Sequence, residues 1–330
     1  MQKFSIILPV YNGGEYVKEC VASVLGQTLQ NFNLIVLDNS STDGTVEWIK
    51  SLNDSRIIIY PSDRNIGINE NWARIKDIPK NEFITMIGHD DLLCTSYLAD
   101  MEALICLHPE ASLYQCHFEF IDAVGKILRK CIPMAEKQYG HDFLQSQLTQ
   151  SLDSTGTGYM MRSRDFDMLG GMPQQYPNLI FADYQLWLQL VLISYKATSP
   201  AFGFQYRLHN STSKLTNGDA YQQAFEKYVY FIASQAKLHH EIQKVLTKYG
   251  GAYLMFFCRS LSHRILKTPI RLRKIKVKEF IGKCRSFAHL WIPNEAFHPM
   301  KKLEIKIAAK LDSYTLSRNL FLIYKKLFRS

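Results

Sequence analysis

Short apolar runs alternate with helical patterns through the first 115 residues. The runs expected to form strands are Phe4–Val10, Leu34–Leu37, RIIIY and EFITMI, and a polar loop follows each of them. Apolar residues have helical spacing after the first loop, over Glu15–Leu25, and again after the second and third loops. Strands that alternate with helices predict a mostly parallel sheet with right-handed crossovers and with ligand loops along one edge.

After residue 115 the alternation loosens. YQCHFEFIDAVGKIL predicts a β-hairpin, STGTGYMMRSRDFDMLGGMPQ a small-residue loop, a short strand and a helix, and FADYQLWLQLVLISY a further helix. Only helices are expected from about residue 220 onward. We therefore predict an α/β domain over residues 1–218, in halves 1–115 and 116–218, and a helical module over residues 219–330.

Charge divides the chain near the same point. The net charge is +9, but residues 1–236 carry 18 Lys and Arg against 25 Asp and Glu, whereas residues 237–330 carry 21 against 5. A basic C-terminal third predicts an anionic contact. Its amphipathic segments, GAYLMFFCRSLSHRILK and LSRNLFLIYKKLFRS, either pack inward or lie on an anionic membrane surface. No nucleic-acid-binding fold accompanies the basic run RLRKIKVK, so no nucleic-acid partner is expected.

Composition favours a globular, cytoplasmic protein. No apolar stretch approaches the about 18 residues that span a bilayer. The first apolar run is broken by Pro9 and Asn12, which predicts a strand and not a signal peptide. Seven cysteines form no CxxC pair, which fits a reducing location and disfavours a zinc site. GxxxxGK[ST] and GxGxxG loops are absent, which disfavours a P-loop ATPase and a nicotinamide-dependent dehydrogenase.

Polar and aromatic residues stand where these phosphate loops would be. The first loop carries Tyr11, the second Asp38, and the fourth, within EFITMIGHDDLL, carries Asp90 and Asp91. An aromatic ring can stack on a base, and adjacent carboxylates at a strand end need a partner or a cation. Mg²⁺ or Mn²⁺ prefers such oxygen ligands and could neutralise a diphosphate. A solvated turn with a helix cap is the alternative.

Five segments resemble glycosyltransferase family 2 in their order and spacing. They are IILPVYNGGEYVKECVASVLGQT, IVLDNSSTDGT, RNIGINENWARI, MIGHDDLL and FADYQLWLQL, and the resemblance covers about residues 1–215. It implies a GT-A fold, a Rossmann-like mostly parallel sheet flanked by helices, followed here by the basic helical module. It also implies an inverting enzyme with a UDP-type nucleotide-sugar donor and a bound Mn²⁺ or Mg²⁺. Residues 1–115 would be the nucleotide-binding half and residues 116–218 the acceptor and catalytic half.

The resemblance assigns donor-binding roles to the first three loops. Tyr11 would flank the donor base, with an ordinary edge-strand tyrosine as the alternative, and Asp38 would contact the uracil or ribose. Gly67 would allow the backbone to approach the donor closely, while Arg64 would serve the diphosphate or stand in solvent. The predicted donor-binding residues on these loops are Pro9, Tyr11, Asp38, Arg64, Asn65 and Gly67.

The segment GHDD is similar to the D-x-D(-D) segment of the family. Gly88 stands where many members have the first Asp. The metal is therefore assigned to Asp90, with Asp91 as a supporting carboxylate on the donor side or a helix cap. His209, in YRLHNSTS, would complete the metal shell or be an ordinary loop histidine.

The segment ADYQLW resembles the family's E/D-D-Y-x-L-W segment, in which the Asp serves as base. Asp183 is thus the predicted general base, and a carboxylate at the start of a helix suits that position. A plain helix N-cap is the alternative. The partner acid of many members is Ala182 here.

The predicted function is hexosyl or N-acetylhexosaminyl transfer to a hydroxyl of a glycan or lipid-linked glycan in the synthesis of a cell-surface polysaccharide (O-antigen, capsule or lipooligosaccharide). The expected location is the cytoplasm, including the inner face of its membrane through residues 250–330. The alternative is a binding module of the same fold that has lost catalysis, because Gly88 and Ala182 replace acidic residues of many family members. A sugar nucleotidyltransferase is disfavoured, because PVYNGGEYV lacks the basic residues of a triphosphate loop.

Overall fold

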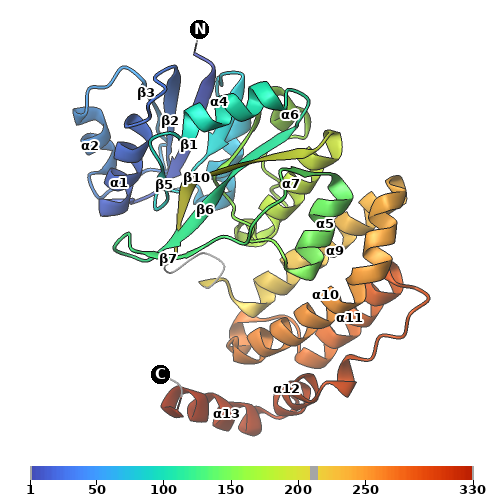
Figure 1. Ribbon diagram of the computed structural model, residues 1–330. Coiled ribbons are helices and arrows are strands. Elements are labelled where there is room, and N and C mark those ends of the chain that lie inside the picture. The colour runs from blue at the N-terminus through green and yellow to red at the C-terminus, as the bar shows by residue number, and fades with distance from the viewer. Residues whose placement is uncertain (1, 209–214, 329–330) are drawn as a thin grey trace. The chain divides into compact units, whose positions relative to one another are not determined.

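The structure, a computed structural model, describes residues 2–208 and 215–328 (Figure 1). The described chain forms two compact units. A sheet unit takes the described parts of Met1–Phe143, Ser151–Gln174 and Ala182–Ser211, and a helical unit takes those of Leu144–Gln150, Gln175–Phe181 and Thr212–Ser330. The sequence pattern gave no sign that residues 144–150 and 175–181 join the helical unit.

A single ten-stranded sheet organises the described part of the sheet unit, in the order β3-β2-β1-β4-β9-β6-β10-β5, with β7 beside β6 and β8 beside β10 (Figure 1). β1 (Phe4–Val10) lies parallel between β2 (Phe32–Asp38) and β4 (Phe83–Met86), and β3 (Ile57–Tyr60) pairs parallel with β2. All residues of β1, β2 and β4 are buried, as expected for parallel strands covered on both faces. The predicted α/β class and its four parallel strands are confirmed.

The helices of the sheet unit follow the predicted rhythm. The valines of the first helix are buried at helical spacing, because Val17, Val21 and Val24 lie on one face. The helical segments up to residue 193 are α1 (Gly14–Leu25), α2 (Thr45–Ser51), α3 (Gly67–Ala73), η1 (Arg74–Lys76), α4 (Tyr97–Leu107), α5 (Gly140–Thr149, shared with the helical unit), α6 (Ser163–Met168), η2 (Pro177–Leu179, in the helical unit) and α7 (Ala182–Ile193).

The second half of the sheet mixes strand directions. The predicted hairpin is confirmed as β6 (Leu113–Ile121) and antiparallel β7 (Ile127–Lys130), and β9 (Tyr159–Arg162) lies antiparallel between β4 and β6. The long strand β10 (Lys196–Arg207) runs parallel to β6 and was not predicted, because KATSPAFGFQYR lacks a period-two pattern and the strand is irregular between Ser199 and Phe204. Two short strands were also missed, β5 (Leu92–Leu93) and β8 (Lys137–Gln138).

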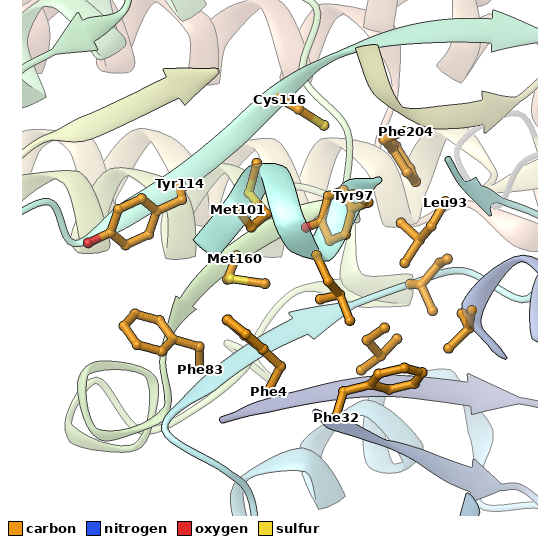
Figure 2. Packing of buried hydrophobic residues seen from close by; sticks show 14 of the residues in the cluster. Phe4, Phe32, Phe83, Leu93, Tyr97, Met101, Tyr114, Cys116, Met160 and Phe204 are labelled. Carbon is orange, nitrogen blue, oxygen red and sulfur yellow. The ribbon is translucent and has the colours of Figure 1, made fainter. Parts of the chain in front are cut away.

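Aromatic and sulfur-containing side chains fill the core beside β4 (Figure 2). The Phe83 ring lies 6.1 Å from the rings of Phe4 and Tyr114. Tyr97 of α4 is fully buried, and its hydroxyl lies 3.0 Å from Thr85 Oγ1 of β4. Because this strand is packed along its length, the loop that leaves its carboxyl end starts from a fixed point.

The helical unit is built from helices alone within the described residues. Asn217 caps its first long helix, since its side chain accepts hydrogen bonds from the backbone N–H groups of Asp219 and Ala220. Among the described residues, no helix combines the length and apolar character that crossing a membrane requires. The helices from residue 218 onward are α9 (Gly218–Leu238), α10 (His240–Lys267), η3 (Ile270–Leu272), α11 (Val277–Trp291), η4 (Pro299–Lys301), α12 (Leu303–Ser313) and α13 (Thr315–Phe328).

The first basic amphipathic segment of the tail packs inward. It lies within α10, where Leu254, Cys258, Leu261 and Ile265 are buried. Trp291 of α11 is buried too, and its Nε1 donates to the Val229 carbonyl oxygen at 3.0 Å. This stripe therefore belongs to the core of the helical unit.

Candidate active site

The loop after β4 carries a buried carboxylate beside a half-buried one. Asp91 is 2% exposed; its Oδ2 accepts from Thr157 Oγ1 at 2.7 Å and its Oδ1 from the Arg207 backbone N–H at 3.0 Å. Burial, and then the charge of Asp90, hold the pKa of Asp91 well above its usual range. Two crowded acidic groups at a strand end fit a divalent cation, which would relieve their mutual repulsion.

The described residues supply this cation site only in part. Among residues 2–208 and 215–328, no three His, Cys, Asp or Glu side chains are grouped so that they could hold a metal. The predicted ligand His209 lies outside the described residues. Asp90 and Asp91 thus fit a cation whose remaining ligands come from elsewhere, and a donor diphosphate has oxygens of the required kind.

Arg207 holds the Asp90 loop in place, and the sequence reasoning missed it. It is the last residue of β10, and its side chain has no exposed surface. Its Nε donates to the Asp90 carbonyl oxygen at 2.8 Å, Nη1 to the Asp122 carbonyl oxygen at 3.2 Å, and Nη2 to Glu19 Oε2 at 2.5 Å. The guanidinium also lies over the Tyr16 ring, 4.7 Å from its centroid. The Arg207 side chain therefore links α1, the loop after β4 that carries Asp90, and the turn between β6 and β7.

Asp183 stands in the first turn of α7 and close to the small-residue loop. A Cβ placed on Gly156 would lie 3.7 Å from Asp183 Oδ2. The residue keeps partial solvent access, and burial raises its pKa to about 6, although hydrogen bonds from the backbone N–H groups of Tyr184 and of Asp183 itself oppose the rise. A carboxylate of this kind is ionised at neutral pH and is a stronger base than an ordinary one.

The small-residue loop brings the predicted carboxylates together. Thr157 bonds to Asp91, and Gly156 adjoins Asp183. Trp187 of α7 fixes this loop, since its Nε1 donates to the Thr155 carbonyl oxygen at 3.0 Å. Trp187 itself has no exposed surface and packs in the core.

Tyr206 of β10 lies among the same carboxylates and was also missed. Burial raises the pKa of its hydroxyl, and the negative charges of Asp91, Asp90 and Asp183 raise it further. The next residue, Arg207, bonds to Asp91 through its backbone N–H, which brings this end of β10 to the carboxylates. The order of parallel strands predicts that the carboxylates meet at one edge of the sheet, but only the position of β10 shows that Tyr206 is near them.

The first two donor loops are fixed by their own polar side chains. Asp38 is 3% exposed, and its carboxylate accepts from the backbone N–H groups of Ser40 at 3.0 Å and of Ser41 at 3.2 Å. Ser40 has a φ of 64°, so these bonds stabilise a left-handed backbone. Tyr11 is 43% exposed and open to a ligand, whereas Pro9 is buried within β1 opposite Leu37.

The third donor loop is joined to the second through Asn39. Its Nδ2 donates to Asn65 Oδ1 at 3.1 Å, and its Oδ1 accepts from the Ile66 backbone N–H at 2.9 Å. An Asp at position 39 could not donate the first of these bonds, which explains the amide there. Gly67 has a φ of 82° with open space around it, and Arg64 is exposed. The predicted donor residues thus line connected loops, and their roles stay predictions.

Comparison with known proteins decides the family. The family model of glycosyl transferase family 2 matches residues 5–170, half of the chain. The chain belongs to glycosyltransferase family 2. An uncharacterized glycosyltransferase of Rickettsia typhi is 29% identical over 195 residues, which are 58% of this chain and 59% of that protein. Glycosyltransferase GlyG of Streptococcus pneumoniae is 32% identical over 91 residues, which are 27% of this chain and 30% of that protein. The chain therefore spans less than two thirds of the length of these relatives.

Solved structures share the fold of this family 2 chain. S. aureus TarS 1–349, in complex with UDP-GlcNAc, superposes with a TM-score of 0.66 at 16% identity, covering 98% of this chain and 92% of that one. Mannosyltransferase PcManGT from Pyrobaculum calidifontis, in complex with GDP-Man and Mn²⁺, gives 0.51 at 12% identity, covering 98% and 88%. The predicted GT-A fold with a C-terminal helical region is confirmed.

Two departures from the family 2 pattern have local reasons. A Cβ on Gly88 would lie 2.7 Å from Asp90 Oδ1 and 3.0 Å from Asp91 Oδ2, so a side chain there would displace both carboxylates. Ala182 has no exposed surface, so an acid in its place would be buried.

Proposed function

We propose that the protein is an inverting glycosyltransferase that moves a sugar from a nucleotide-diphosphate donor, a UDP-sugar in the first instance, to an acceptor hydroxyl. The observation that carries this proposal is that the small-residue loop brings Asp91 and Asp183 together in a family 2 chain, because Thr157 bonds to Asp91 and Gly156 lies beside Asp183. The solved neighbours with UDP-GlcNAc and with GDP-Man support a nucleotide-sugar donor and leave uridine and guanosine to be compared by experiment.

Asp183 is the proposed base of a single displacement. It accepts the proton of the acceptor hydroxyl while that oxygen forms a bond to the anomeric carbon of the donor sugar. The bond from the anomeric carbon to the diphosphate breaks on the opposite face, and its electron pair leaves with the nucleoside diphosphate. An α-linked donor therefore gives a β-linked product. A pKa of about 6 keeps Asp183 ionised at neutral pH and ready for this role.

Asp90 is the proposed ligand of Mn²⁺ or Mg²⁺. Asp91 is the proposed supporting carboxylate, and His209 is a further candidate ligand. When bound, the cation would neutralise the charge that develops on the departing diphosphate. The chain itself holds the loop in place, because Arg207 bonds to the Asp90 backbone carbonyl oxygen and both Arg207 and Thr157 bond to the Asp91 carboxylate. Tyr11, Asp38 and the Asn65–Gly67 loop would bind the base and ribose.

The proposed acceptor is a glycan or a lipid-linked glycan in cell-surface polysaccharide synthesis, and the proposed location is the cytoplasm or the inner face of its membrane. The basic C-terminal third supports an anionic or lipid-carried acceptor. A catalytically degenerate binding module is the second candidate, favoured by Gly88 and Ala182. Metal-dependent hydrolysis of a donor separates the two, since only an enzyme releases nucleoside diphosphate.

Thermal stability against UDP, GDP, CDP and dTDP, with and without Mn²⁺, tests the donor site. Ligand binding raises the melting temperature with the logarithm of ligand concentration over Kd. We expect a shift with UDP that requires Mn²⁺ and is lost in Asp90→Ala, with Asp77→Ala as a control on a surface loop. Absence of any nucleotide shift would contradict the proposal.

A further inference from the structure

The last two helices expose apolar side chains in a unit that otherwise buries them. On α12, Leu303 and Ile307 are 66% and 46% exposed; on α13, Leu316, Leu320 and Ile323 are 74%, 58% and 56% exposed. These five residues stand at helical spacing within their helices. They form what we call the C-terminal apolar face.

Buried polar contacts hold this face outward. Arg318 of α13 is 4% exposed; its Nε donates to the Leu266 carbonyl oxygen at 3.0 Å and its Nη2 to the Thr268 carbonyl oxygen at 2.6 Å. Side chains two positions apart on a helix point in directions about 200° apart around its axis. Leu316 and Leu320 are each two positions from Arg318, so they lie on the opposite side of α13. The exposure of α13 is therefore a consequence of how the helix is fixed.

The neighbouring helix is anchored in the same way. Asp312 of α12 is 2% exposed at its side chain and accepts from Arg273 Nη2 at 2.6 Å and from the Val277 backbone N–H at 2.8 Å. Ile305 and Ala308 are buried on the same side of α12. Leu303 and Ile307 consequently point away from the helical unit.

Lysines border the C-terminal apolar face. Lys306 and Lys310 are exposed on α12 beside Ile307, and Lys301 and Lys302 are exposed just before the helix. A helix with apolar residues on its outer face and lysines along their margin has the composition of one that lies in a membrane interface. The positive charge complements the anionic headgroups of a bilayer.

We propose that the C-terminal apolar face docks the protein on an anionic lipid bilayer. A soluble polyanion would use the lysines but leave the five apolar residues in water. A second copy of the chain would place lysine margins against each other, which like charges oppose. The proposal extends the proposed function, because a lipid-linked acceptor lies at such a surface, but vesicle binding itself does not require the donor site.

Flotation of the full-length chain with phosphatidylcholine vesicles, with and without phosphatidylglycerol, tests this proposal. We expect binding to the anionic vesicles that weakens at high salt, because salt screens exposed charges. Leu316→Ser with Leu320→Ser should weaken binding at least about tenfold, since binding scales with buried apolar area. Lys306→Gln with Lys310→Gln should weaken it by about fivefold per lysine.

Leu107→Ser with Met168→Ser is the matched control, because both residues are 69% exposed but lie in the sheet unit. The control should bind vesicles as the wild type does. A wild type that stays unbound, or a Leu316/Leu320 variant that binds equally well, would overturn the proposal. An oligomer that this variant breaks, with flotation unchanged, would overturn it in favour of a second copy. Vesicle binding without any nucleotide shift would leave this proposal standing and remove the proposed function.

Discussion

The carboxylate site and the C-terminal apolar face both use charged side chains but hold them differently. Asp91 and Arg207 are buried, with hydrogen bonds to fixed partners on several elements. Lys306 and Lys310 stand in solvent at the margin of exposed apolar residues. Buried polar groups are held in one geometry by their hydrogen bonds, whereas each exposed charge contributes little by itself and the contributions add. Single substitutions should therefore have large effects in the first region and small ones in the second.

Replacing Arg207 should produce the largest loss of stability. Arg207→Met leaves the Glu19 carboxylate and several backbone carbonyl oxygens without their donor, so we expect a loss of about 3–5 kcal/mol in the free energy of unfolding. The side chain of Glu19 is half exposed, so Glu19→Gln should cost no more than about 1 kcal/mol. Urea denaturation measures both, and equal losses would contradict the role given to Arg207.

The raised pKa of Asp183 predicts that activity and stability change with pH in opposite directions. The proposed base must be ionised to act, so kcat/KM for donor turnover should fall about tenfold per pH unit below about 6 and level off above it. Burial disfavours the ionised form in the folded state, so the stability contribution of this group is lost as pH rises from about 4 to about 6. An acidic limb with a midpoint near 4 would contradict the environment described for Asp183.

Adding one methyl group at each of two glycines, Gly88 beside the carboxylates and Gly282 in the helical unit, should give smaller effects. Gly88→Ala places a methyl group 2.7 Å from Asp90 Oδ1, and we expect about tenfold weaker Mn²⁺-dependent UDP binding, a difference of about 1.4 kcal/mol. Gly282→Ala in α11 meets no atom within 4 Å and should stabilise the fold by about 0.5–1 kcal/mol. Titration calorimetry gives the affinities, and unchanged UDP binding in Gly88→Ala would show that the carboxylates can move freely.

The sequence predicted the part of the fold that local patterns determine. Apolar runs and loops located the parallel strands, and strand direction alone predicted that Asp38, Asp90 and the other loop residues would meet at one edge. Strand β10 was not predicted, because its apolar pattern is irregular and it begins at a lysine. That residue, Lys196, has no exposed surface, and burial lowers its pKa to about 7. Arg207 and Tyr206 were missed with that strand.

The two amphipathic tail segments show a second limit. Both have the same apolar period, but the stripe around Leu254 and Leu261 is buried in α10, whereas Leu316 and Leu320 are exposed on α13. Periodicity predicts that a helix has an apolar face and does not say what covers it. The contacts of Arg318, distant in sequence from Leu266, decide the orientation of α13.

Donor turnover by Asp183→Asn, measured beside its affinity for UDP with Mn²⁺, tests the central claim most directly. The proposed base predicts a loss of about 10²–10⁴-fold in release of UDP from a UDP-sugar, with UDP affinity unchanged. The variant should also melt at a higher temperature than the wild type at pH 8, because a partly buried negative charge has been removed. Wild-type turnover in a folded Asp183→Asn protein would contradict the account.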